Sequence, residues 1–509
     1  MSGWKQKDQS WNKLHQSRVA KVNCAMRNGI HLPRHRYGLG GVSEHSCNAR
    51  QLEPPEVARG KSLHAASGRL SGKCMHGLAP RLYRWNAEEE EARPSSVYPK
   101  GLTPYSQLEH PTPSSLAAAA VTLCGVCAFL GLYCTQPMLP MLEGLFHASK
   151  TAVGMTVSAA TLGVAFSAPI FGALAERLPR KSVIVFAAFG VSVPTLLAAT
   201  STTLAQLIFW RFLQGITVPG IIAVVITYIG EEWPPDRVAL IMSFYVSGTA
   251  LGGFIGRITS GIVADHFNWR VSFLALGAAS LAGAAAIAAW LPRGARRSPP
   301  AAHDLDHSFI RQVQGLLRSR RLIATFAVGF NVLFSMVGVF SWITFYLSAP
   351  PFRLSATALS SLFFVYLIGL VVTPAAGYLI TRVGLRAGIA GAIVCSIIGV
   401  LLTLDRSLVV VIIGLTLLSS GVFISQTASS SHLRVASPPG ARVTAAGLYI
   451  TCYYLGGATA GVLPGAFWAM GGWPACVAFI VAMQMVALLI ALIGWRAPKN
   501  FNPADLGIR

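Results

Sequence analysis

Two arginines lie inside long apolar runs of the sequence, where a charged side chain is costly. Arg211 and Arg257 each lie about seven residues from the end of such a run. An ionisable group at membrane depth costs about 2.5–3.5 kcal/mol and usually faces a partner or a cavity. A guanidinium also binds carboxylate and carbonyl oxygens in pairs. The arginines are therefore candidates for binding an anionic or carbonyl-bearing solute, or else structural partners of Glu143 or Asp265.

Other polar or aromatic side chains in the apolar runs can bond a solute or form an aromatic wall around it. They are Tyr133, Gln136, Gln214, Asn331, Trp342 and Gln426. Bonding between helices or anchoring at the membrane interface explains each of them equally well. No Asp or Glu lies well inside an apolar run, which favours a neutral or anionic substrate over a lipophilic cation. Proton coupling would then run through carboxylates at the run ends, such as Glu143 or Asp265.

The sequence lacks the residue motifs that covalent or cofactor chemistry requires. The sequence shows no paired carboxylates, metal cluster, nucleophile triad or phosphate-binding loop at useful spacing. Cys124 and Cys127 have CxxC spacing but stand in an apolar run without other ligands, so we interpret them as small core residues. We expect a chain that is not an enzyme and that uses neither a metal nor another cofactor.

The elements that position these side chains are predicted by composition and run length. Hydrophobic residues make up 53% of the chain and charged residues only 12%, far below a soluble protein. Each apolar run is long enough to cross a bilayer as a helix. The sequence predicts an all-α membrane protein with twelve transmembrane helices, at 116–136, 151–173, 182–200, 204–229, 239–264, 271–291, 322–347, 357–380, 387–404, 408–430, 443–467 and 474–495.

The basic residues in the loops predict the orientation. Arg180 and its neighbours follow the second span, Arg382 follows the eighth, and the strongly basic stretch 293–321 follows the sixth. Positive residues remain on the cytoplasmic side, so both termini should be cytoplasmic in a multi-pass protein of a bacterial inner membrane. Apolar residues at helical spacing over 309–317 further predict an amphipathic helix on the inner membrane surface.

These boundaries divide the chain into five segments. We expect a polar basic extension over 1–115, a six-helix bundle over 116–292, a central loop over 293–321, a second bundle over 322–495, and a tail over 496–509. The net charge of +22 is concentrated in the extension and in short loops, which argues against nucleic-acid binding. Three explanations of the extension remain open: a disordered tail, an arm contacting anionic lipid, or a start codon assigned too far upstream.

An internal repeat supports the division into two bundles. The segment Gly172-Ala-Leu-Ala-Glu176-Arg177 recurs 205 positions later as Gly377-Tyr-Leu-Ile-Thr381-Arg382. Arg237 matches Arg442, and Gly252 matches Gly457, at the same offset. Duplicated halves are typical of transporter folds, which bind substrate between the halves near mid-membrane.

Three motifs carry a resemblance to a known family. The segment 172–181 resembles the loop signature between helices two and three of the major facilitator superfamily, with Glu176 for Asp and Pro179 for Gly. The segment 211–215 resembles its fourth-helix signature. A series of glycines resembles the fifth-helix motif of the family's antiporter branch, except that Arg257 stands where that motif commonly has Pro. The glycines are Gly248, Gly252, Gly253, Gly256 and Gly261.

The resemblance covers about 116–500 and is nearest to the sugar-efflux and drug–proton antiporter permeases. It implies a monomeric secondary transporter that exports a small organic solute in exchange for protons. An importer of an organic anion has the same fold, and a membrane sensor or scaffold that has lost transport is an alternative from another class.

The loop motif also has a physical interpretation. Charged residues at an abrupt helix end can bond to a neighbouring helix in one conformation and release it in another, which makes a two-state latch. Orientation by positive charge alone is the competing explanation. The candidates for the latch are Gly172, Glu176, Arg177, Arg180, Lys181 and Arg382.

Overall fold

The computed structural model describes residues 115–293 and 305–495. The predicted extension, apart from Ser115, and the predicted tail lie outside these residues. Within them every regular element is a helix, which confirms the predicted all-α class.

The helices form two groups that follow each other in the chain. The first group is α3 (Ser115–Leu130), η1 (Gln136–Met138), α4 (Leu139–Phe146), α5 (Lys150–Arg177), α6 (Arg180–Ala198), α7 (Leu204–Thr217), α8 (Pro219–Glu232), α9 (Pro235–His266) and α10 (Trp269–Trp290). The second is α11 (Leu305–Arg318), α12 (Arg320–Ser348), α13 (Ala356–Ser361), η2 (Leu362–Leu367), α14 (Ile368–Val383), α15 (Leu385–Leu402), α16 (Leu408–Ala436), η3 (Pro439–Ala441), α17 (Arg442–Ala460) and α18 (Pro464–Gly494).

Ten helical segments of the described chain are long and apolar enough to cross a membrane, and α3 is a shorter apolar helix. The prediction was wrong at two span ends. The first span was expected to continue to residue 136, but α3 ends at Leu130 and turns follow over 131–135. The span expected over 443–467 ends at Ala460, because Pro464 begins a new helix, which itself kinks at Gly472 with φ of 62°.

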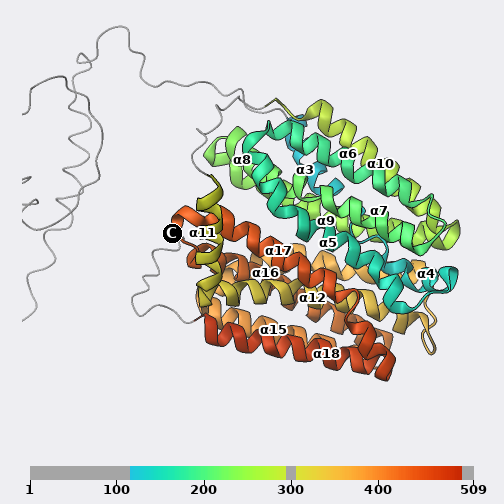
Figure 1. Ribbon diagram of the computed structural model, residues 1–509. Helices are drawn as coiled ribbons and strands as arrows, with labels where there is room; N and C mark the ends of the chain where they lie inside the picture. The colour runs from blue at the N-terminus through green and yellow to red at the C-terminus, as the bar shows by residue number, and fades with distance from the viewer. Residues whose placement is uncertain (1–114, 294–304, 496–509) are drawn as a thin grey trace, which may run out of the picture. The chain divides into compact units, whose positions relative to one another are not determined.

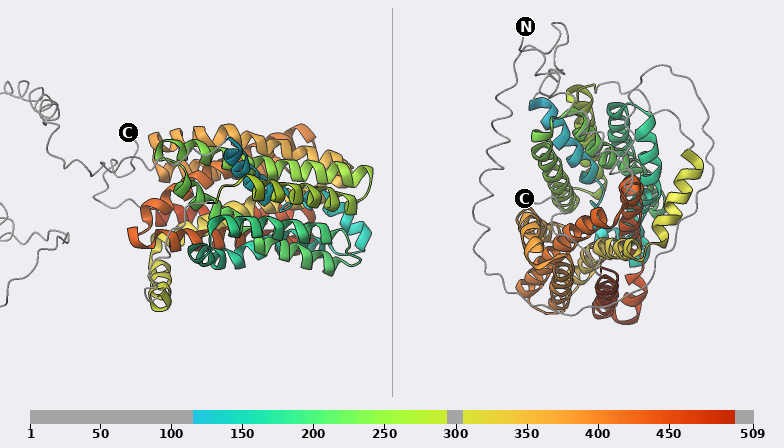
Figure 2. Two further views of the ribbon diagram at one scale, coloured as in Figure 1. Left: turned by 90° about the horizontal axis from the view of Figure 1, so that it is seen from above. Right: turned by 90° about the vertical axis from the view of Figure 1, so that its left-hand side faces the viewer.

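Figure 1 shows the helices α3 to α10 gathered in one half and α12 to α18 in the other, with their long axes roughly aligned. Only α11 runs across the helix ends, as Figures 1 and 2 both show. It corresponds to the amphipathic helix predicted in the central loop. Its Leu316 is buried in a small cluster with Leu322, Phe326 and Tyr449. This packing fixes α11 against the second half.

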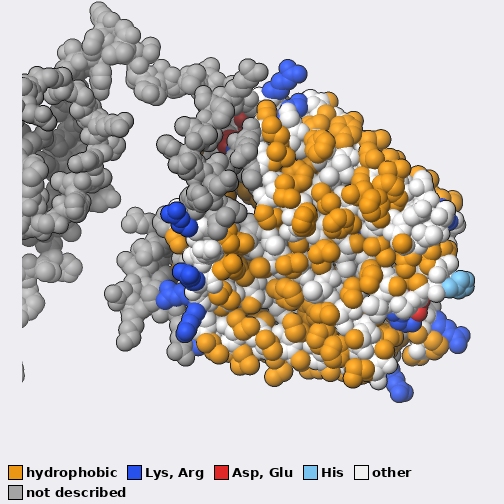
Figure 3. All heavy atoms as spheres, viewed as in Figure 1, with side chains coloured by type: hydrophobic (Ala, Val, Ile, Leu, Met, Phe, Trp, Pro, Cys, Tyr) orange, Lys and Arg blue, Asp and Glu red, His pale blue; other side chains and the backbone are white. Residues whose placement is uncertain are grey.

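The bundle has two ends, which we name after residues that lie there. The Glu143 end holds α4, the start of α5 and the end of α12, and the Arg180 end holds the start of α6 and the helix α11. Apolar side chains cover the middle of the visible face, and Lys and Arg side chains gather toward its ends (Figure 3). Such a band is what a protein surrounded by lipid requires.

The two halves touch through α5 with α17 and through α9 with α13. Glycines make the first approach close, because a Cβ atom on Gly154 would lie 2.2 Å from the carbonyl oxygen of Gly461. On α9, a Cβ on Gly261 would lie 2.3 Å from the Cβ of Ser360. Both approaches lie toward the Glu143 end, so the halves are packed together there.

Glycines also explain how α9 packs within the first half. Cβ atoms on Gly248, Gly252 and Gly256 would lie 2.3, 2.4 and 1.8 Å from carbonyl oxygens of α3 that are four residues apart. Small residues four apart let two helix backbones approach this closely. Close packing of α9 against α3 is therefore one purpose of this glycine series.

We expect Gly256→Ala to destabilise the protein, because the new methyl group would overlap the carbonyl of Leu130. Overpacking of this kind costs about 1–3 kcal/mol. Gly230→Ala on α8 is the matched control, since nothing lies within 4 Å of its Cβ position. Thermal unfolding in detergent measures both. An unchanged melting temperature for Gly256→Ala would contradict the close approach.

Candidate functional site

Arg211 binds the chain where the first helix is interrupted. The Nη1 and Nη2 atoms of Arg211 donate hydrogen bonds to the carbonyl oxygens of Gly131 and Leu132 in the turns that follow α3, where the Gly131 oxygen also accepts the backbone N–H of Cys134. Its Nε donates to the carbonyl oxygen of Thr156 on α5, at 3.1 Å. The side chain is 0% exposed. Arg211 therefore connects three segments of the first half.

Gln214 completes this network one turn farther along α7. Its Oε1 accepts a hydrogen bond from Arg211 Nη1, and its Nε2 donates to Thr195 Oγ1 of α6 at 2.8 Å. Two of the predicted cavity residues thus lie together, but in a buried contact between helices. All three guanidinium nitrogens of Arg211 are engaged, so this arginine has a structural role in the conformation described.

Arg257 is also buried, at 3% exposed, but its bonding is incomplete. Its Nε donates to Gln136 Oε1 at 2.7 Å, and its Nη1 donates to the carbonyl oxygen of Gly253 at 2.7 Å. Its Nη2 makes no hydrogen bond with any described residue. One edge of this guanidinium is therefore available to another acceptor.

Three aromatic rings surround that guanidinium. The Cζ atom of Arg257 lies 4.7 Å from the ring centre of Tyr133, 4.9 Å from Phe363 and 4.6 Å from Tyr366. We call Tyr133, Gln136, Arg257, Phe363 and Tyr366 the Arg257 cluster. It joins the two halves, because Phe363 and Tyr366 belong to η2.

A hydrogen bond reinforces the junction between the halves. Gln136 Nε2 donates to Ser341 Oγ of α12 at 3.0 Å. Sequence reasoning found Tyr133, Gln136 and Arg257 but missed Phe363, Tyr366 and Ser341. Nothing distinguishes these three from ordinary residues of an apolar span, and only the packing of the halves brings them to the arginine.

The expected structural pairing of the arginines with end-placed carboxylates is wrong. Glu143 Oε1 instead accepts from Lys150 Nζ at 2.5 Å, and Asp265 Oδ2 accepts from the backbone N–H of Thr357 at 3.2 Å. The reason is depth: both carboxylates lie at the Glu143 end, while the arginines bond to groups farther inside. No Asp or Glu among the described residues bonds to Arg211 or Arg257.

The remaining cavity candidates lie in the second half. Trp342 is 0% exposed and donates its indole N–H to the carbonyl oxygen of Ala460, which is a helix-packing contact. Asn331 borders a void of about 10 Å³, and its Nδ2 has no partner among the described residues. Gln426 has a buried Oε1 that is likewise unbonded within the described chain. None of the three belongs to the Arg257 cluster.

The latch candidates lie at the Arg180 end. Gly172, Glu176 and Arg177 belong to α5, but their side chains lie outside the described residues. Arg180 forms an ion pair with Glu231 at 3.3 Å, within the first half.

The other two latch candidates form no ion pair between the halves within the described chain. Arg382 hydrogen-bonds to the hydroxyl of Tyr378 on its own helix, and Lys181 lies in the first turn of α6. The latch therefore stays a prediction.

The family model of the Major Facilitator Superfamily matches residues 121–461. This chain belongs to that superfamily. The transporter is therefore a secondary carrier and not an enzyme, as the sequence predicted. Its helical halves, with a polar cluster between them, are consistent with that membership.

Curated relatives extend over most of the transporter. An uncharacterized transporter of Buchnera aphidicola (subsp. Schizaphis graminum) is 32% identical over 72% of this chain and 88% of the relative. The inner membrane transport protein YnfM of Escherichia coli is 32% identical over 72% of this chain and 87% of the relative. The uncharacterized MFS-type transporter YybF of Bacillus subtilis is 31% identical, covering 72% and 90%.

Solved structures share the fold of the transporter at low sequence identity. A mutant of the nucleoside transporter NupG has a TM-score of 0.63 at 14% identity, covering 75% of this chain and all of that one. The human organic anion transporter MFSD10 has a TM-score of 0.57 at 18% identity, covering 74% and 99%. These similarities establish the fold alone.

We expect Arg211→Gln to lower the stability of the transporter by about 3 kcal/mol or more, because it removes charged donors from three buried carbonyl groups. Arg237→Gln on the surface of α9 is the matched control for the loss of one charge, with an expected effect within about 0.5 kcal/mol. Denaturation in detergent compares the two. Equal stability of Arg211→Gln and the unaltered chain would refute the structural role.

Proposed function

We propose that this transporter carries a small organic anion, or a neutral solute with a carbonyl group, in a site at the Arg257 cluster. One observation supports the proposal most directly: a buried arginine between the halves retains an unbonded Nη2 and has no carboxylate partner among the described residues. A guanidinium edge in this state is suited to bind a carboxylate or carbonyl oxygen.

The charges around Arg257 favour an anionic solute. A buried charge without a partner is costly, and Arg257 is balanced here only by neutral acceptors and ring faces. An anionic solute would supply the opposite charge that Arg257 lacks, whereas Arg257 would repel a cationic solute. Arg211 adds a second positive charge in the same half, with all its nitrogens already bonded.

The surroundings of the cluster favour a solute with an aromatic or other flat surface. Tyr453 and Tyr454 of α17 have ring centres 5.3 Å apart and lie near Tyr133. Tyrosines offer ring faces together with hydroxyl donors. Since the rings come from both halves, a bound solute would contact both, as alternating access requires.

The direction and the coupling ion are further parts of the proposal. We place the Arg180 end and both termini in the cytoplasm of a bacterial cell whose inner membrane holds the protein, and we propose efflux in exchange for protons. Resemblance of the α9 glycine series to the antiporter motif supports efflux. The described conformation would then be closed toward the outside, where Gly154 meets Gly461.

Two carboxylates at the closed end are suited to proton coupling. Asp265 accepts a hydrogen bond from Thr357 across the halves. Glu143 holds Lys150, whose ammonium lies 5.6 Å from the ring centre of Phe345 in the other half. Protonation of Asp265 would weaken its contact between the halves, and protonation of Glu143 would weaken the ion pair that holds Lys150 beside Phe345. Both effects support the proposal that protons open the outer side.

The test of substrate class is a thermal-shift screen of the full chain in detergent with organic anions, neutral sugars and lipophilic cations. We expect stabilisation by anions, by about 2.7 kcal/mol at a hundredfold excess over the dissociation constant. Arg257→Gln should abolish it, and Arg237→Gln should retain it. Stabilisation by cations, or anion binding that survives in Arg257→Gln, would refute the assignment.

The test of coupling uses Asp265→Asn in proteoliposomes with the anion found in that screen. The variant cannot be protonated at this position, so we expect solute exchange at equal pH to persist while transport driven by a pH gradient falls about tenfold or more. Asp405→Asn is the control, because among the described residues the side chain of Asp405 bonds only to the nearby backbone N–H of Ser407. Normal gradient-driven transport by Asp265→Asn would exclude this carboxylate from coupling.

A further inference from the structure

A cavity lies at the Glu143 end, separate from the Arg257 cluster. Its volume is about 550 Å³, within the range of sites for small molecules. Both halves line it: Met141 of α4 and Lys150 of α5 belong to the first half, and Phe345 of α12 and Trp468 of α18 belong to the second. No member of the Arg257 cluster lines this cavity.

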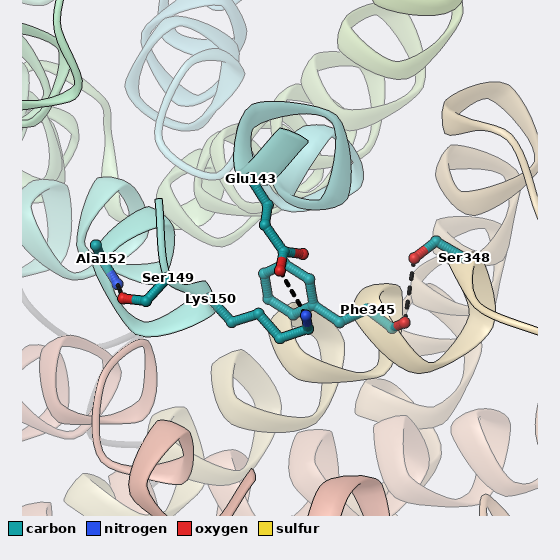
Figure 4. A network of polar contacts seen from close by, with 6 residues as sticks. All are labelled: Glu143, Ser149, Lys150, Ala152, Phe345 and Ser348. Atoms are coloured by element: carbon teal, nitrogen blue, oxygen red, sulfur yellow. Dashed lines mark hydrogen bonds and ion pairs between the residues drawn. The ribbon is translucent and has the colours of Figure 1, made fainter. Parts of the chain in front are cut away.

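An ion pair forms the polar wall of the cavity. Lys150 Nζ lies 2.5 Å from Glu143 Oε1, and each side chain is 29% exposed. Figure 4 shows the two side chains meeting in front of Phe345, with Ser149 bonding the backbone of Ala152 at the start of α5. This N-cap contact fixes the turn from which Lys150 projects.

The pair does not use all of its bonding capacity. Glu143 Oε2 makes no hydrogen bond among the described residues. The ammonium of Lys150 has one acceptor among them, which is Glu143 Oε1. The ammonium also lies 5.7 Å from the ring centre of Trp468, whose indole N–H has no described partner. One carboxylate oxygen and at least two cationic N–H donors therefore remain for a ligand.

The two charges together restrict which ligand can gain from them. A simple anion would be attracted by Lys150 and repelled by Glu143, and a simple cation would meet the reverse. A molecule that carries both signs close together can place each against its opposite. Apart from Ser348, the other side chains of the wall are apolar, among them Pro140, Leu354 and Leu359, which suits a hydrophobic side chain.

We propose that this cavity binds a small zwitterion with an apolar side chain, of the amino-acid type, with its ammonium on Glu143 Oε2 and its carboxylate on Lys150. The site lies outside the Arg257 cluster and does not depend on the substrate proposed there, although it shares Glu143 and Lys150 with the proposed proton coupling. Because its walls come from both halves, a bound zwitterion would favour the conformation in which the Glu143 end is closed.

The test measures equilibrium binding of three probes to the purified full chain carrying Arg257→Gln, so that an aromatic carboxylate cannot bind at the proposed transport site. The probes are phenylalanine, phenethylamine, which lacks the carboxylate, and 3-phenylpropionate, which lacks the ammonium. We expect phenylalanine to bind about tenfold more tightly than either, a difference of about 1.4 kcal/mol. Glu143→Gln and Lys150→Gln should each remove this preference, and the double exchange Glu143→Lys with Lys150→Glu should restore it.

Two controls separate this site from the rest of the protein. Glu231→Gln removes a partner of the ion pair at the Arg180 end and should leave phenylalanine binding unchanged. The Arg257→Gln exchange, present in every variant, is the second control, because it removes the proposed transport site from the measurement. Equal binding of phenylalanine and phenethylamine, phenylalanine binding that persists in Glu143→Gln, or the absence of saturable binding would each overturn the proposal.

Discussion

Backbone carbonyl groups inside a membrane must find donors within the protein, and this constraint shapes the first half. The helix α3 stops at Leu130, so the turns over 131–135 leave carbonyl groups that water cannot reach. Arg211 donates to two of them and to Thr156 on α5. Backbone N–H groups satisfy some of the carbonyl oxygens in these turns, and Arg211 supplies the donor for Leu132 and a second donor for Gly131.

The interruption in turn determines what lies between the halves. Tyr133 lies in the turns, and Gln136 begins the short helix η1 that follows them. In an unbroken helix the side chains of Tyr133 and Gln136 would point in other directions. With the turns in place, Tyr133 lies against Arg257, and Gln136 lies between Arg257 and Ser341. The buried network of Arg211 is thus a condition for the cluster that joins the halves. Arg211 stabilises the backbone of the turns, and these turns place Tyr133 and Gln136 beside the partly unbonded Arg257.

The sequence predicted the class of fold because that class depends on local properties. Run length, apolar content and loop charge are enough to find membrane helices, whereas the breaks at Pro219, inside one predicted span, and at Pro464, near the end of another, were not predicted. The same reasoning found Arg211 and Arg257 as costly buried charges. It could not separate their roles, since both are arginines at similar depth. The difference lies in distant partners: Gly131 and Leu132 saturate one, and Phe363 and Tyr366 enclose the other without bonding it.

Contacts within a half and contacts between halves differ in kind, and the difference suits a carrier that must open. Arg211 holds its half together with several buried hydrogen bonds that would have to break at once. Between the halves the polar contacts are smaller: Gln136 to Ser341, Asp265 to Thr357, and the cations of Lys150 and Arg257 over rings of the second half. Each such contact is worth about 1 kcal/mol. Glycines such as Gly154 allow close approach without interlocking side chains. A small change in charge or a bound solute can therefore shift the balance between closed and open while each half remains folded.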